Sequence, residues 1–332
     1  MSSQVPISQS TSTPLHNVHR ITLPTPFAVG DVNAYLAEGE PLTLIDAGVR
    51  TEACRAVLEA ALAERGYQLR DLQQVIVTHH HTDHVGLVGD IAAESGASVV
   101  AHRLTAPWLA DFVNVRAAND GFYAQFFREQ GVPEPYIIGM GAGNRVFNQF
   151  ASPVQATRQL EDGDSVSFAG LVWQIYHTPG HAGDQICLYQ PEQQVLLSSD
   201  HILPNISSNA FLEPPLPTES ARPKRLLQYR AALARIAALP IATALPGHGL
   251  PFGDVANLVA ERLKAHHLRA EKILRLCEVP RTLYELARLT FPKAGDADIF
   301  LILSEVIGHL DLLEAEGKIH AEARDGVLYW TP

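Results

Sequence analysis

Cysteine is scarce in this sequence of 332 residues. The three cysteines, Cys54, Cys187 and Cys277, are widely spaced, each lies in an apolar segment, and none belongs to a CxxC pair. Such spacing is typical of buried free thiols rather than of a cysteine-based metal site or a disulfide framework.

An excess of positive charge and long apolar runs are also lacking. The formal net charge of −11 argues against broad attraction to nucleic acid or to an anionic membrane. No apolar run approaches the roughly 20 residues that cross a bilayer, so we expect no membrane partner. Residues 1–19, a predicted flexible tail, have neither the basic start nor the apolar core of a secretory signal. These absences favour a cytoplasmic location.

The most informative stretch that is present reads T-H-H-H-T-D-H-V-G and covers residues 78–86. It follows the β-branched run Val75-Ile76-Val77, which predicts a buried strand, and a helix is predicted from Gly86 onward. A histidine-rich tag is the alternative interpretation, but a tag would stand at a terminus and would not follow a buried strand.

The spacing of the polar residues in this stretch indicates a metal site. Side chains alternate along extended chain, so His79 and His81 can bind one metal ion while His80 points elsewhere. As the chain bends, Asp83 and His84 can turn toward a second ion. Imidazole nitrogen with some carboxylate oxygen is a donor set that zinc favours.

Strands and helices alternate along the chain, which indicates an α/β fold. Residues 104–150 interrupt this alternation with helical, aromatic-rich segments and are interpreted as an insertion. The remaining candidate ligands each follow a predicted strand. Since the C-terminal edge of strands is where sites assemble in α/β folds, we expect these residues to converge in one cleft: Asp46, His181, Asp200 and His248.

The whole series resembles the metallo-β-lactamase superfamily over residues 20–252. The resemblance implies a four-layer αβ/βα sandwich with a dinuclear site on the edge between two β-sheets. It also implies two ligand sets that share one carboxylate: His79, His81 and His181 for the first ion, Asp83, His84 and His248 for the second, and Asp200 as the bridge.

Further catalytic roles are implied for residues beside these ligands. Asp46 would contact ligands rather than a metal ion, while Asp83 is both a ligand and a catalytic candidate. The leaving-group proton could come from a metal-bound water, from His201 or from Tyr176, and the sequence does not rank these sources.

Two features narrow the resemblance within the superfamily. Asp200 stands in the context Ser198-Ser199-Asp200, where the commonest class of antibiotic-hydrolysing zinc β-lactamases has a cysteine. In this respect the chain is similar to the members of the superfamily that include glyoxalase II, lactonases and phosphodiesterases. The segment His266-His267-Leu268-Arg269 resembles the branch typified by β-lactamase-like protein 2. That branch appends a winged-helix-like domain, which we place at residues 253–332 as a small α+β unit.

The predicted winged helix does not have the charge of a DNA-binding domain. Its longer helix, predicted at residues 299–315, lies in a stretch (298–316) with five acidic residues and no lysine or arginine, which phosphate contacts would disfavour. We therefore expect no duplex DNA binding, and a structural, cleft-shaping or homodimerising role for this domain.

The function implied is that of a dinuclear metal-dependent hydrolase. Two divalent ions, zinc first with iron or manganese as alternatives, would lower the pKa of a bridging water from 15.7 to about 7 and so supply hydroxide. A small acyl substrate (thioester, lactone or related ester) suits an acidic protein with an aromatic-rich insertion.

Two other functions stay open. The first is a metal-dependent phosphodiesterase or endoribonuclease, for which RNA is the partner and the short basic cluster Arg222, Lys224 and Arg225 the only basic feature found. The second is a metal-binding regulatory or effector protein with vestigial activity, against which the complete ligand set argues.

Overall fold

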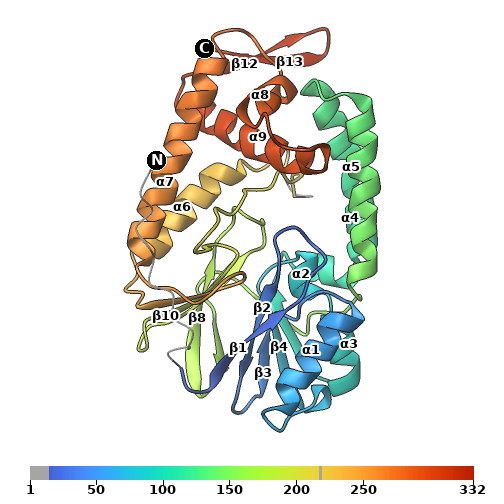
Figure 1. Cartoon of the computed structure of the whole chain (residues 1–332), viewed down its shortest axis with the longest axis vertical. Coiled ribbons are helices and arrows are strands. Elements are labelled where there is room, and N and C mark those ends of the chain that lie inside the picture. Colours follow the sequence, from blue (N-terminus) through green and yellow to red (C-terminus); the bar gives the residue numbers. More distant parts are fainter. Residues whose placement is uncertain (1–14, 217–218) are drawn as a thin grey trace. The chain divides into compact units, whose positions relative to one another are not determined.

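The computed structural model describes residues 15–216 and 219–332 (Figure 1). Most of the predicted tail, residues 1–14, lies outside the described residues, and residues 18 and 19 already belong to the first strand. None of the described helices is long and apolar enough to cross a membrane.

Residue contacts divide the chain into two compact units. The first holds residues up to Phe112 together with Phe147–Ser208 and Ala232–Val259, and the second holds Val113–Val146, Asn209–Ala231 and Ala260–Pro332. Residues 113–146, the larger part of the predicted insertion, therefore group with the C-terminal part of the chain, whereas residues 104–112 and 147–150 group with the first unit.

The first unit contains two β-sheets. The six-stranded sheet has the order β1-β2-β3-β4-β5-β6, with β1 to β3 antiparallel and β3 to β6 parallel: β1 Val18–Leu23, β2 Val32–Ala37, β3 Thr43–Ile45, β4 Gln74–Val77, β5 Ser98–His102 and β6 Arg158–Leu160. The five-stranded sheet has the order β11-β10-β9-β8-β7, in which only β10 and β11 are parallel: β7 Ser165–Phe168, β8 Leu171–His177, β9 Ile186–Gln190, β10 Val195–Ser199 and β11 Thr243–Pro246.

The alternation of side chains along β4 explains how the layers form. Ile76 points into the core that also contains Trp173 and Leu188 of the second sheet. Its neighbours Val75 and Val77 point to the opposite face, into a core shared with helices α1 and α3. A central parallel strand buried on both faces is expected to be apolar throughout, as this one is.

The helices of the first unit follow the predicted pattern. Helix α1 (Glu52–Ala63) begins after Thr51, whose side chain accepts a hydrogen bond from the backbone N–H of Cys54, as an N-cap residue should. A 3₁₀ turn follows at Leu69–Asp71. The histidine turn leads into α2 (Thr82–Val85) and α3 (Val88–Ser95).

Gly86 fixes the position of this turn. Its backbone N–H donates to the carbonyl of Gly48 at 2.8 Å. A Cβ at Gly86 would stand 2.3 Å from the backbone nitrogen of Arg50, so only glycine permits the approach. The chain after β4 is thereby held against the chain after β3.

The second unit is mainly helical. Its elements, some of which begin or end in the first unit, are α4 (Ala106–Glu129), α5 (Glu134–Val146), α6 (Arg225–Ala237), α7 (Val255–Leu276), α8 (Leu283–Thr290), α9 (Ile299–Ala315), β12 (His320–Arg324) and β13 (Val327–Thr331), with a 3₁₀ turn at Asp296–Asp298; the 3₁₀ turn at Phe147–Phe150 belongs to the first unit. Helix α4 is kinked at Asp111, where the backbone is not helical. The unit boundary falls at this kink.

Aromatic contacts explain why the insertion groups with the C-terminal segment. The rings of Tyr123 and Phe127 lie 5.7 and 6.2 Å from that of Phe300 on α9, and Trp330 on β13 donates to the side chain of Gln130 at 3.1 Å. The order α7, α8, α9 and hairpin is that predicted for a winged helix, with a bridge from Arg281 to Trp330. The winged-helix assignment stays a prediction.

Candidate metal centre

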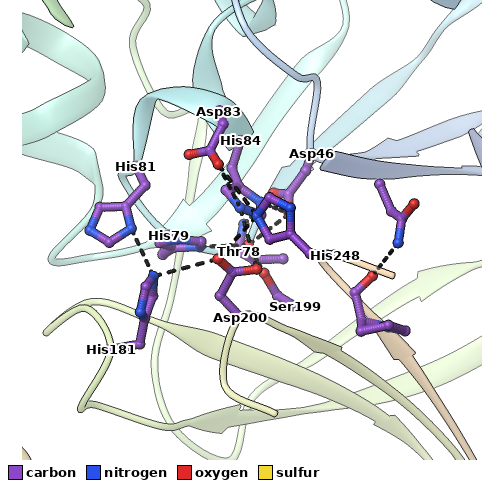
Figure 2. A network of polar contacts seen from close by, with 12 residues as sticks. Asp46, Thr78, His79, His81, Asp83, His84, His181, Ser199, Asp200 and His248 are labelled. Carbon is purple, nitrogen blue, oxygen red and sulfur yellow. Dashed lines mark hydrogen bonds and ion pairs between the residues drawn. The ribbon is translucent and has the colours of Figure 1, made fainter. Parts of the chain in front are cut away.

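The predicted ligands converge at the edge between the two sheets of the first unit. Asp46 and the histidine turn follow β3 and β4 of one sheet, whereas His181, Asp200 and His248 follow β8, β10 and β11 of the other. Figure 2 shows these side chains pointing toward one another. Three groups form, in each of which the ligand atoms all lie within 4.8 Å of one another: His79, His81 and His181; Asp83, His84 and His248; and His79, His84 and Asp200.

The first group consists of three imidazole rings. Nε2 of His181 lies 2.9 Å from Nδ1 of His81, and the rings of His79 and His81 are 4.6 Å apart. Nε2 of His79 is buried and has no hydrogen-bond partner among the described residues. Burial of an unpartnered polar atom is costly, so this nitrogen is suited to bind an ion.

In the second group, hydrogen bonds to the δ nitrogens orient both rings. Nδ1 of His84 lies 2.8 Å from Oδ2 of Asp46, and Nδ1 of His248 lies 2.7 Å from the carbonyl oxygen of Asp31. Because a carbonyl can only accept, Nδ1 of His248 carries a proton, and Nε2 is the ring nitrogen that would bind a metal ion, with loss of its own proton. This Nε2 faces Asp83 at 3.4 Å.

Asp200 lies between the two groups. Its Oδ1 is 3.5 Å from Nε2 of His84, and its Oδ2 is 3.5 Å from Nε2 of both His181 and His248. A Cβ on Gly247 would stand 2.0 Å from Oδ1 of Asp200, so glycine is required beside the carboxylate. A carboxylate in this position can be shared by two ions.

A hydrogen-bonded network behind the ligands supports Asp46. Thr78 donates to this carboxylate from its backbone N–H at 2.9 Å and from its hydroxyl at 2.8 Å. The same hydroxyl lies 2.8 Å from Oγ of Ser199. Asp46 and Ser199 both have positive φ, at 58° and 43°, and non-glycine residues in this strained region often occur at functional sites. The sequence did not predict a role for Thr78 or Ser199.

His80 points away from both groups, as predicted. Its Nδ1 lies 2.8 Å from Oδ1 of the buried Asp184, and its ring stacks on Trp108 at 4.0 Å. The sequence did not single out Asp184, which holds the central histidine of the turn and so helps to orient its two neighbours.

The acidic side chains and the histidines of the centre shift the pKa of one another. Burial opposes the charge on His248, but Asp200 and Asp83 outweigh it and raise the pKa of His248 to about 10. Burial likewise opposes ionisation of Asp200, but the attraction of its carboxylate to His84 and His248 is stronger, so the pKa of Asp200 is lowered. At His79 burial dominates and lowers the pKa, with His84 adding to the effect. The centre thus combines ionised carboxylates with an uncharged imidazole at His79.

The two predicted proton donors lie outside the ligand groups. His201 is fully buried, and burial lowers its pKa to about 3. Tyr176 donates to the side chain of Gln174 at 3.3 Å and carries the guanidinium of Arg235 over its ring. A donor role for either residue stays a prediction, and these surroundings disfavour it.

The model of the metallo-beta-lactamase superfamily matches residues 28–248. This chain belongs to the metallo-β-lactamase superfamily. It is 33% identical to "Probable metallo-hydrolase YqjP" of Bacillus subtilis (strain 168), over 95% of this chain and 97% of the relative. The family and this relative together show a metal-binding hydrolase.

Two further comparisons agree with this assignment. The crystal structure of a metallo-beta-lactamase family protein from Thermus thermophilus superposes with a TM-score of 0.82 at 28% identity and covers 96% of this chain and 99% of that chain. A "Hydroxyacylglutathione hydrolase" from Methylobacterium nodulans is 27% identical over 77% of this chain and 81% of the relative. The predicted fold of the catalytic domain is confirmed.

Proposed function

We propose that this chain is a dinuclear metal-dependent hydrolase that acts on an acyl substrate, namely a thioester, a lactone or a related ester. The observation that carries the proposal is the pair of ligand groups with Asp200 between them. The buried, unpartnered Nε2 of His79 and the ring orientations of His84 and His248 support the fit of divalent ions.

The three cysteines are poorly suited to act as nucleophiles, which supports a water-dependent reaction. All three cysteines are buried, and burial raises the pKa of Cys54 to about 11, of Cys187 to about 12 and of Cys277 to about 11. A thiol that stays protonated at neutral pH is a poor nucleophile. Water is therefore the attacking group that we propose.

Each part of the centre has its own task in this proposal. When bound, two ions would activate that water and polarise the acyl oxygen. His79, His81 and His181 would hold one ion, Asp83, His84 and His248 the other, and Asp200 both. Asp46 would keep Nε2 of His84 aimed at its ion through the bond to Nδ1, and Thr78 would hold Asp46. Zinc suits this mixed set of donors, as do iron and manganese.

An acyl substrate is favoured over RNA by two observations. The name of the Methylobacterium nodulans relative describes hydrolysis of an acyl thioester of glutathione. In the second unit, the basic cluster that the RNA alternative needs is paired internally: Arg222 with Asp311, Lys224 with Glu314, and Arg225 with Glu213. Because these three side chains already form ion pairs with carboxylates, they are poorly available for contacts with a phosphate backbone.

The test is a substrate panel on protein reconstituted with zinc, iron or manganese. We expect hydrolysis of thioesters, lactones or esters, and no more than trace cleavage of a phosphodiester. Faster cleavage of the phosphodiester would replace the proposal with the nuclease alternative. Metal-loaded protein that hydrolyses nothing in the panel would instead support a regulatory role.

A further inference from the structure

A groove of about 340 Å³ opens beside His248 in the first unit. Its walls come from β1 and β2, from the loop between these strands and from the loops that follow β10 and β11. A ligand in this groove would contact a residue of the candidate metal centre, because His248 lines both. The volume is within the usual range of ligand pockets.

Arg20 supplies a cation to this groove. It lies two residues from Thr22 on β1, so both side chains are on one face of the strand, and Thr22 is paired with Asn33 of β2. Nη1 of Arg20 donates to Oγ1 of Thr22 at 2.8 Å and to Oδ1 of Asn33 at 3.2 Å. Over residues 15–216 and 219–332, no carboxylate forms an ion pair with Arg20. Its charge is held in place by neutral oxygen atoms.

Asn33 fixes the arginine relative to the metal centre. Its side-chain amide donates to the carbonyls of Pro246 at 2.9 Å and of Gly249 at 2.8 Å, which flank His248. The amide oxygen of the same residue accepts from Arg20. One side chain thus joins the cation to the loop that carries a proposed ligand.

The groove also has apolar side chains in its walls, and two of them are partly exposed. Val29, in the loop between β1 and β2, is 44% exposed, and Ile206, after β10, is 47% exposed. Both line the groove. Large apolar side chains exposed on two sides of one groove are suited to contact the body of a ligand rather than solvent.

We propose that this groove binds a part of the acyl substrate that ends in an oxyanion such as a carboxylate, and that Arg20 recognises that group. The inference rests on the proposed function, since it names the substrate class for the same centre. Arg20 is a specificity-determining residue in this account, and Val29 and Ile206 contact the chain between the reacting acyl carbon and the anion.

A second charged residue in the groove should affect anion binding in the opposite direction to Arg20. Asp31 lines it as well, and its carboxylate repels an anion in the groove, whereas only its backbone oxygen contacts His248. Removal of that carboxylate should therefore strengthen anion binding, and removal of the Arg20 charge should weaken it.

The experiment measures binding by calorimetry to zinc-loaded protein with two non-hydrolysable thioethers of equal length, one ending in a carboxylate and one in its primary amide. We expect the carboxylate to bind about tenfold more tightly, as one charge-assisted hydrogen bond can provide. In Arg20→Gln, which keeps a donor for Thr22 and Asn33, the preference should vanish while the amide affinity and the zinc content stay unchanged. Asp31→Asn should increase the preference for the carboxylate probe. The control is Arg70→Gln, which should leave this preference unchanged because Arg70 is exposed and lies outside the groove.

Several results would overturn this inference. In the native protein, these results are equal binding of the two probes or binding of neither probe. In Arg20→Gln, they are a preference for the carboxylate probe that persists, or a loss of zinc together with a loss of affinity for both probes. The last result would mean that Arg20 only supports the loop around His248. The proposed function fails separately, if no acyl compound is hydrolysed even though the carboxylate probe binds with the expected dependence on Arg20.

Discussion

Two clusters of buried histidines in this molecule differ in what surrounds them. In the first unit, the rings of the candidate metal centre face the carboxylates of Asp83 and Asp200 and one another. In the second unit, His266 and His309 are also buried, with ring centres 5.9 Å apart. There the carboxylate of Glu305, which lies 3.8 Å from Nδ1 of His309, is already paired with Arg269.

The comparison shows that burial alone does not make a histidine a ligand. Burial lowers the pKa of His266 to about 3, and His309 and Arg230 add to the effect, so this ring is a neutral part of the core. At the metal centre, by contrast, carboxylates offset the burial of His84 and His248 and raise the pKa of both. Convergent donor atoms with nearby carboxylates, rather than histidine content, distinguish the site.

The largest effect should come from Asp200→Ala, which removes the carboxylate that both ligand groups share. We expect loss of at least one metal ion and a fall in turnover of about a hundredfold or more, in line with the contribution of metal catalysis. His80→Ala is the comparison, and we expect it to do less harm, because His80 bonds to Asp184 and faces away from the ligand groups. Elemental analysis and steady-state kinetics would measure both variants. Equal activity of the two would contradict the ligand assignment.

A smaller effect is expected from Thr78→Val. This change keeps the shape of the side chain but removes the hydroxyl that donates to Asp46 and contacts Ser199. Loss of a partner behind a ligand typically costs tenfold to a hundredfold in metal affinity, so we expect about tenfold. Competition with a zinc chelator would measure the change, and an unaltered affinity would show that Asp46 is held well enough by the backbone of Thr78.

The second histidine cluster predicts a dependence of stability on pH. The pKa of His266 is lower in the folded protein, about 3, than in an unfolded chain, about 6.5. Below pH 6.5 the unfolded chain therefore binds a proton that the folded state does not, and stability is lost as the pH falls, by up to about 1.4 kcal/mol per pH unit. His266→Leu should lose less stability between pH 7 and pH 5 than the native protein in urea titrations. Parallel losses would indicate that His266 is accessible to protons in the folded state.

The sequence predicted those parts of the fold that depend on local pattern. The run Val75-Ile76-Val77 forms most of β4, and the helix predicted at residues 299–315 has these bounds in α9. The candidate ligands were recognisable because each follows a strand, where the backbone turns and the side chain points into the shared edge. Both the periodicity of a segment and the end of a strand depend on residues that are adjacent in the sequence, so they can be predicted from it.

The supporting residues could not be predicted, because their partners are distant in the chain. Thr78 meets Ser199 across 121 positions, and His80 meets Asp184 across 104. Nothing in the local sequence of a threonine, a serine or an aspartate marks it for such a contact. The grouping of the insertion with the C-terminal segment has the same cause, since it depends on rings such as those of Tyr123 and Phe300.

The metal content of the purified, reconstituted chain tests the central claim most directly. Elemental analysis should find close to two transition-metal ions per chain, because two groups of donors share Asp200. The same analysis of His266→Leu should give the same value, since that histidine belongs to the core of the second unit. No more than trace metal in the native protein would contradict the account, and a single ion would contradict its dinuclear form.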